Sequence, residues 1–174
     1  MIYAVVYILA VLLANYTAIM FVPLPVFGLV SVGTLIFGVT FTMRDHVHAY
    51  GRKAVYTMIA AAAVLMVLES VFLAVPWRII GASFTAIVLA EATDTEIYQR
   101  LLHRSWFVRV LGSNAISIPI DSVLFNVLAF VGVFTVPILV AIVFGEIVVK
   151  FATGGLVALW RSSIAPTAIL DSLK

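Results

Sequence analysis

Residues 79–98 read IIGASFTAIVLAEATDTEIY, an apolar stretch that nevertheless contains Glu91 and Asp94. The chain around it has 174 residues, of which 64% are hydrophobic and only 10% are charged, whereas about 25% are charged in an ordinary soluble domain. With a mean hydropathy of +1.23, the sequence predicts an integral membrane protein. An ionised side chain at the centre of a bilayer costs about 2.5–3.5 kcal/mol on insertion scales. Acidic residues in such a stretch therefore predict a polar cavity between helices, where something is bound or moved.

Six segments have about the 20 apolar residues that a helix needs to cross a hydrocarbon core of about 30 Å. They are residues 2–22, 25–43, 54–75, 79–98, 114–133 and 136–160. Each is expected to be a helix, because open strands cannot satisfy their backbone groups in lipid. The prediction is an all-α, polytopic membrane bundle of six helices, with residues 1–174 forming one domain.

The lysines and arginines predict how this bundle is oriented. One side, which holds both termini, carries eight of them: Arg44, Arg52, Lys53, Arg100, Arg104, Arg109, Arg161 and Lys174. Arg78 alone lies on the other side, and Lys150 lies inside a span. By the positive-inside rule both termini are predicted to face the cytoplasm, in a multi-pass protein of the cytoplasmic (inner) membrane.

The chain lacks the motifs of an enzyme. It has no cysteine, which excludes disulfides, thiolate metal sites and cysteine nucleophiles. No glycine-rich phosphate loop, nucleophile elbow or HExxH is present. The basic loops also lack the interleaved aromatic residues typical of nucleic-acid binding. We therefore expect no catalytic residue, metal site or cofactor, and the expected partners are membrane lipid and a small molecule rather than nucleic acid.

The polar residues of the 79–98 span share one helix face. They follow the i, i+3, i+4, i+7 spacing of a single stripe: Glu91, Asp94, Thr95 and Tyr98. Two interpretations of Asp94 stay open, since it either contributes to a cavity or reaches the interface and pairs with Arg100 or Arg104. Glu91 lies deeper and is expected to face the cavity.

A second stripe runs along the 114–133 span and consists of Asn114, Ser117, Asp121 and Phe125. Asn114 could instead cap the helix, because Ser113-Asn114 opens the span directly after Gly112. Asp121 lies about two turns inside the membrane. A cavity role for Asp121 is therefore favoured over a structural hydrogen bond to another helix.

Glu146 and Lys150 lie four residues apart with the acid first, which is the favourable order for an ion pair within one helix. Mutual neutralisation is favoured over direct ligand contact, although Lys150 could equally be the counter-ion of Asp121 or Glu91. Asn15 is a lone amide in the first span. It fits a helix–helix hydrogen bond somewhat better than a ligand contact.

Two other groups of polar residues lie near the ends of predicted helices. Glu69 is near the outer end of the third span and could pair with Arg78. Asp45, His46 and His48 follow one another on the cytoplasmic side and could be imagined as a metal site. No further ligand lies nearby in sequence, so a solvated loop is the favoured interpretation.

Three stretches together resemble the integral-membrane family of vitamin uptake transporters, whose studied members import queuosine precursors. Residues 33–56, GTLIFGVTFTMRDHVHAYGRKAVY, resemble the family's second helix and its short Asp-bearing loop ending in Tyr-Gly-Lys. Residues 90–102, AEATDTEIYQRLL, resemble its polar residue followed by an Asp and an aromatic residue. Residues 106–130, WFVRVLGSNAISIPIDSVLFNVLAF, resemble its basic loop, small polar start, central Asp and following Phe.

The resemblance implies a six-helix fold with the N-terminus inside. It also implies site roles, by position, for Asp45, Asp94, Asn114 and Asp121, whereas roles for Glu91 and Lys150 rest on the physical argument. The second loop departs from the family pattern, because it is one residue shorter than the common pattern and lacks the acidic residue of that pattern. The exact substrate therefore stays open.

A 7-deazaguanine base fits the chemistry of these polar groups. Its ring N–H and exocyclic amine are two adjacent donors that one carboxylate can accept, and an aromatic side chain can stack on its face. Asp121 or Glu91, if left without a counter-charge, could also take up a proton during transport. The predicted substrate-binding residues are Asn15, Glu91, Asp94, Tyr98, Asn114, Asp121, Phe125 and Lys150.

Three functions stay open from the sequence. The leading one is a secondary transporter that imports 7-cyano- or 7-aminomethyl-7-deazaguanine, alone or as a homodimer. The alternative is the substrate-binding subunit of an energy-coupling-factor vitamin importer, with the stripe of Ala10, Ala14 and Ala18 docking a partner's helices. The third is an intramembrane enzyme that uses Glu91 and Asp94, although no nucleophile or metal-ligand spacing supports it.

Overall fold

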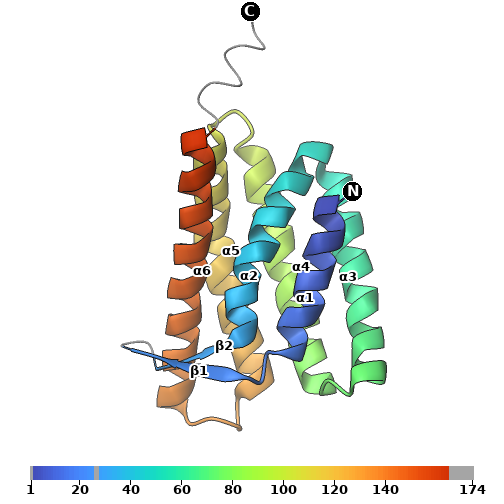
Figure 1. Cartoon of the computed structure of the whole chain (residues 1–174), viewed down its shortest axis with the longest axis vertical. Coiled ribbons are helices and arrows are strands. Elements are labelled where there is room, and N and C mark those ends of the chain that lie inside the picture. The colour runs from blue at the N-terminus through green and yellow to red at the C-terminus, as the bar shows by residue number, and fades with distance from the viewer. Residues whose placement is uncertain (1, 26–27, 165–174) are drawn as a thin grey trace, which may run out of the picture.

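The computed structural model describes residues 2–25 and 28–164. Within these ranges six α-helices form a bundle (Figure 1): α1 Ile2–Tyr16, α2 Val32–Val47, α3 Arg52–Leu73, α4 Trp77–Arg100, α5 Trp106–Phe130 and α6 Val136–Ile164. A 3₁₀ turn, η1 (His48–Tyr50), links α2 to α3. The strands β1 (Phe21–Leu24) and β2 (Gly28–Ser31) form a hairpin before α2. The predicted helical bundle is therefore confirmed, with one short hairpin added.

The bundle exposes many large apolar side chains and buries several charged ones, unlike a soluble domain. Phe72, Val136 and Leu156 are 78%, 72% and 66% exposed, whereas Arg44 and Lys150 are buried. Such a surface suits a lipid environment. Three helical stretches are long and apolar enough to cross a membrane by length and composition, namely Arg52–Leu73, Trp106–Phe130 and Val136–Leu156. Crossing by all six helices stays a prediction.

The prediction of two continuous helices over residues 2–22 and 25–43 is wrong where these segments meet. Helix α1 ends at Tyr16, and β1 then pairs antiparallel with β2, with Phe21 opposite Ser31. Pro23 and Pro25 have no backbone N–H and disfavour a helix interior. The argument against strands applies to open edges in lipid, whereas these strands pair with each other and β2 packs against α6 at one end of the bundle (Figure 1).

Helix α2 extends further than predicted. It runs to Val47, so Arg44 is part of the helix rather than of a polar loop over residues 44–53. After η1, Gly51 adopts a φ of +91°, which glycine reaches at little cost because it has no Cβ. This residue lets the chain turn so that α3 can begin at Arg52.

Helix α5 begins earlier than predicted. Ser105 is its N-cap, and Ser105 Oγ accepts a hydrogen bond from the backbone N–H of Val108 at 3.4 Å. The helix therefore starts at Trp106 and includes Asn114 well inside it. The interpretation of Asn114 as a helix cap is wrong.

Small residues bring α1 and α2 close together. Ala10, Ala14 and Ala18 are buried, and a Cβ added to Gly33 would collide with the carbonyl oxygen of Ala14. This is the close backbone approach that small residues permit between membrane helices. The alanine stripe is used inside the bundle, so it is not available to dock a partner's helices.

Candidate functional site

Arg44 is the centre of one buried polar network, here called the arginine cluster, which consists of Arg44, Asp45, Glu91, Asp94 and Asn114. Arg44 Nη1 donates a hydrogen bond to Glu91 Oε2 at 3.0 Å, and Nη2 donates one to Asn114 Oδ1 at 3.0 Å. Nη2 also lies 3.2 Å from Asp94 Oδ1 and 3.4 Å from Asp45 Oδ1. One guanidinium thus links acids and an amide from α2, α4 and α5.

Asp94 is fixed in the interior of the bundle by two partners. It forms a salt bridge with Arg44 and accepts a hydrogen bond from Ser117 Oγ at 2.9 Å. Both carboxylate contacts come from neighbouring helices, and the side chain is fully buried. The interpretation in which Asp94 reaches the interface and pairs with Arg100 or Arg104 is therefore wrong.

His48 is buried, so the favoured interpretation of a solvated loop is wrong for it. Its ring stacks on Tyr98 with centroids 4.1 Å apart, and its Nε2 lies 3.7 Å from Asp94 Oδ2. Burial lowers the pKa of His48, which lies between α2 and α3, and the ring is therefore neutral at pH 7. His46 lies within α2 and stacks on Tyr3 instead.

Asp45, His48 and Asp94 form a grouping that could hold a metal ion. One ligand atom from each lies within 4.8 Å of the others. Arg44, however, pairs with both of these carboxylates, and its positive charge opposes a cation at the same place. We therefore assign the three residues to the arginine cluster rather than to a metal centre.

Lys150 is the centre of a second network, the lysine cluster, which consists of Lys150, Asp121, Ser122, Glu146 and Asn126. Lys150 Nζ donates hydrogen bonds to Asp121 Oδ2 at 2.7 Å, Ser122 Oγ at 3.0 Å and Glu146 Oε2 at 3.4 Å. Asn126 Nδ2 also donates to Glu146 Oε2, at 2.8 Å. Lys150 thus pairs with Glu146 and with Asp121 at the same time. The predicted pair within one helix and the predicted role as counter-ion of Asp121 are therefore both correct.

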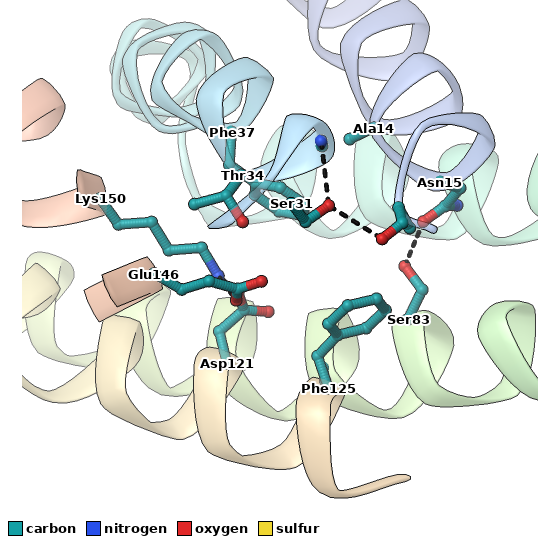
Figure 2. A pocket seen from close by; sticks show the side chains of 13 residues that line it. Ala14, Asn15, Ser31, Thr34, Phe37, Ser83, Asp121, Phe125, Glu146 and Lys150 are labelled. Carbon is teal, nitrogen blue, oxygen red and sulfur yellow. Dashed lines mark hydrogen bonds and ion pairs between the residues drawn. The ribbon is translucent and has the colours of Figure 1, made fainter. Parts of the chain in front are cut away.

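A central cavity of about 10 Å³ lies beside the lysine cluster, with room for about one water molecule. Figure 2 shows Asp121, Glu146 and Lys150 on one side of it and Asn15 and Ser83 on another. The full lining is Ala14, Asn15, Ala18, Ser31, Gly33, Thr34, Phe37, Ser83, Ala86, Asp121, Phe125, Glu146 and Lys150. A small chamber that combines charged side chains with apolar ones and two aromatic rings therefore occupies the middle of the bundle.

A larger cavity of about 510 Å³, the end cavity, lies where α2, η1 and α4 end. It is lined by Tyr3, Asp45, His46, His48, Ala49, Tyr50, Gly51, Tyr98, Gln99, Leu102, Trp106 and Arg109. Its size suits a small organic molecule. The arginine cluster lies between the two cavities along α2, because Phe37 lines the central cavity and Asp45 lines the end cavity.

The two networks hold more acids than bases. Their five carboxylates are Asp45, Glu91, Asp94, Asp121 and Glu146, and their two cations are Arg44 and Lys150. With all of these groups ionised, three negative charges have no counter-charge within the clusters. Glu146 Oε1 and Asn126 Oδ1 are also buried acceptors without a hydrogen-bond donor. The interior is therefore suited to a ligand rich in donors or positively charged.

The structure divides the predicted substrate-binding residues between neighbouring places. Those that line the central cavity are Asn15, Asp121, Phe125 and Lys150. Those that belong to the arginine cluster are Glu91, Asp94 and Asn114. Tyr98 lines the end cavity. No described contact joins Lys150 to Glu91, so the predicted pairings that the structure realises are those with Glu146 and Asp121.

Arg44 and Phe37 are site residues that the sequence pattern alone does not single out, whereas Glu146 is recognised as the ion-pair partner of Lys150. Arg44 is counted as a loop charge because it follows the apolar run. A signal for α2 exists nonetheless, because Thr34, Phe37, Phe41 and Arg44 follow helical spacing. Extending the helix by one turn would have placed Arg44 on the face of Phe37.

The predicted pair of Glu69 and Arg78 does not form. Arg78 Nε donates to the carbonyl oxygen of Leu128 at 2.8 Å, and its Nη2 donates to that of Val131. Glu69 is 6% exposed, and Asn15 is the described side chain that interacts with it. The turn between α3 and α4 thus directs the two side chains to different neighbours.

The comparisons with known proteins support a transport role for this architecture. A family described as "putative vitamin uptake transporter" has a model that matches residues 31–163, more than half of the chain. The match covers the arginine and lysine clusters and leaves out Asn15. The curated proteins and the solved structures gave no match.

Proposed function

The chain belongs to the putative vitamin uptake transporter family, and on this basis we propose that it is a secondary importer of a queuosine precursor. The proposed substrates are 7-cyano-7-deazaguanine and 7-aminomethyl-7-deazaguanine, carried across the cytoplasmic (inner) membrane. Family membership and the apolar helices support membrane transport of a small molecule. The choice of substrate rests on the chemistry of the interior.

The two acidic side chains at the central cavity are the observation that carries this proposal. Asp121 and Glu146 both line the cavity, and Glu146 Oε1 has no donor. The ring N–H and exocyclic amine of a deazaguanine are paired donors, and hydrogen bonds to a carboxylate are stronger than neutral ones. Phe37 and Phe125 lie at the wall of the same cavity (Figure 2). Their faces suit a flat aromatic ring.

The excess of negative charge favours the aminomethyl precursor over the cyano precursor. Its primary amine is a cation at neutral pH, and an ammonium group has three donors and no acceptor. Glu146 Oε1 and Asn126 Oδ1 are the buried acceptors that lack donors beside Lys150. We propose that the ammonium group of the substrate satisfies them.

Substrate binding requires the bundle to open around the central cavity. A space of about 10 Å³ holds about one water molecule and no purine-sized ligand, so the structure represents a closed state of this site. The end cavity of about 510 Å³ is already large enough for such a ligand. We propose that it faces the cytoplasm and forms the release side, because the basic loops lie at that end.

Proteoliposomes that contain only the purified chain test this proposal. The expected result is counterflow of labelled 7-aminomethyl-7-deazaguanine, lost in Asp121→Asn and kept in the control Glu96→Gln, at equal incorporation. Glu96 is the matched acid, because it is partly exposed and pairs with Arg52 outside both clusters. Binding without counterflow would favour the substrate-binding subunit of an energy-coupling-factor importer. If the purified chain showed no binding and no counterflow, this substrate would be excluded.

A further inference from the structure

Glu69 is an acidic residue for which the described part of the chain shows no salt bridge. The described part of the chain contains seven acidic residues, and six of them belong to salt bridges with Arg44, Arg52 or Lys150. Glu69 is the seventh. It lies on α3 with 6% exposure, and both of its carboxylate oxygens are buried.

The surroundings of Glu69 offer one polar side chain and no charge. Asn15 on α1 is the described side chain that interacts with it, and Asn15 Nδ2 has no other partner. On α4, Ser83 Oγ donates to Asn15 Oδ1 at 2.6 Å, so the amide is oriented from both sides. The nearest cation by sequence, Arg78 at the start of α4, uses its guanidinium on backbone carbonyls of α5 and the following turn.

An ionised carboxylate in this place would be costly. Burying an unpaired charge in an apolar medium costs far more than burying the neutral acid, and such a group neutralises instead. Ionisable residues inside membrane helices are accordingly rare and usually functional. A protonated Glu69 would avoid this cost, and the neutral carboxyl would suit Asn15 as a neighbour.

Asn15 connects the position of Glu69 to two cavities. It lines the central cavity, together with Asp121 and Lys150. It also lines a cavity of about 160 Å³, the outer cavity, whose other walls are Tyr16, Ile19, Met20, Leu73, Ala74, Val75 and Pro76. The outer cavity lies at the end of the bundle opposite the end cavity, because it is formed where α1 and α3 end. A proton from that side could thus reach a residue adjacent to the substrate chamber.

We propose that Glu69 is a proton-binding site whose loading and release couple uptake to a proton gradient. This inference rests on the proposed transport function and adds its energy source. The proton binds Glu69 from the outer cavity while Asn15 faces it, and it is released once the helices rearrange and a polar route to the other side opens. Asp121 and Glu91 are less suited to this role, because each already forms a salt bridge, Asp121 with Lys150 and Glu91 with Arg44.

A hydrophobic carbodiimide tests proton binding without any substrate. Such reagents modify protonated carboxyl groups in apolar surroundings, and mass spectrometry locates the adduct. In the wild-type chain in detergent, we expect modification at Glu69 that declines as the pH rises, and none at the exposed, ion-paired Glu96. No adduct at Glu69, or equal labelling of Glu69 and Glu96, would overturn the proposal. This result does not depend on whether the deazaguanine is the substrate.

Coupling is tested in proteoliposomes with the medium more acidic than the interior. The wild type is expected to accumulate 7-aminomethyl-7-deazaguanine against its gradient, whereas Glu69→Gln should keep counterflow and lose accumulation. Glu96→Gln should behave like the wild type. Accumulation by Glu69→Gln, or a wild type that ignores the pH gradient, would overturn the coupling role. Absence of counterflow in the wild type would instead count against the proposed substrate, and the carbodiimide result would still decide whether Glu69 binds a proton.

Discussion

Arg44 and Lys150 each pair with several acids inside the bundle, so the loss of either side chain would leave more than one acid without its partner. Arg44 pairs with Asp45, Glu91 and Asp94 with its side chain fully buried. Removing one partner of a buried ion pair leaves an uncompensated charge, which costs about 3–5 kcal/mol. Exposed ion pairs contribute about 0–1 kcal/mol, because water already solvates both groups.

Replacing Arg44 is therefore expected to destabilise the protein strongly. Arg44→Met should lower the free energy of unfolding by about 3–5 kcal/mol, since three acids lose their counter-charge. The matched control Arg52→Met removes the half-exposed partner of Glu96 and should cost less than about 1 kcal/mol. Thermal unfolding in detergent measures both. Equal melting temperatures for the two variants would contradict the buried network.

His48 gives the stability of the protein a dependence on pH. Its pKa is below the ordinary value of about 6.5 because of burial, so the unfolded chain binds a proton more readily than the folded one. The stability that comes from neutral His48 is complete above about pH 6.5 and is lost as the pH falls through the lower pKa of the folded state.

The comparison of the wild type with His48→Gln tests this sign. Acidification from about pH 8 to about pH 5 should lower the melting temperature of the wild type more than that of the variant. The other histidines are present in both proteins, so their contribution cancels in the comparison. An identical loss on acidification would show that His48 is not buried in a neutral form.

The sequence predicts which polar residues face inward but not which of them meet. The stripes through Asp94 and Asp121 follow from helical spacing on their own helices, and both residues lie in the interior. The partner of Asp94 could not be predicted in this way, because Arg44 follows an apolar run and counts as a loop charge until α2 is known to continue. Pairing between helices depends on their packing, which local patterns do not encode.

At the scale of elements, α1, the hairpin and α2 show the limit of hydropathy as a guide. An apolar run from residue 2 to residue 43 predicts two helices, yet the structure places the β1–β2 hairpin between them. Hydropathy is equally high for a buried strand and a helix, so only Pro23 and Pro25 mark the change. After the hairpin, α2 returns alongside α1, and the two helices pack closely.

Gly33 tests that packing. A Cβ at this position would meet the carbonyl oxygen of Ala14 on α1, and backbone cannot yield as a side chain can. Gly33→Ala should therefore lower the free energy of unfolding by about 1–3 kcal/mol, the usual cost of overpacking. Gly81→Ala on α4 is the control, because its Cβ would meet open space. If Gly33→Ala were as stable as Gly81→Ala, the close approach of α1 and α2 would be wrong.

At the scale of the whole molecule, the order of the helices gives a topology that labelling can check. Helix α1 begins and α6 ends at the same end of the bundle, while the α5–α6 turn lies at the opposite end (Figure 1). The basic residues between α4 and α5 are predicted to face the cytoplasm. Arg44 lies in the interior, so it no longer counts among the loop charges used to predict the orientation. The remaining lysines and arginines still favour the same orientation.

The absence of native cysteines makes this test direct. Thr135→Cys, in the α5–α6 turn, should react with a membrane-impermeant maleimide on intact cells. Arg104→Cys, between α4 and α5, should react only after permeabilisation. Labelling of Arg104→Cys on intact cells, with Thr135→Cys protected, would reverse the orientation and place the end cavity outside.

The central claim is that this chain by itself imports a queuosine precursor through its polar interior. The most direct measurement is the queuosine content of tRNA in cells that can neither make nor import the precursor, supplied with 7-aminomethyl-7-deazaguanine. The wild-type chain should restore queuosine, and Asp121→Asn at the same membrane level should not. No restoration by a wild-type chain shown to be in the membrane would contradict the claim, as would full restoration by Asp121→Asn.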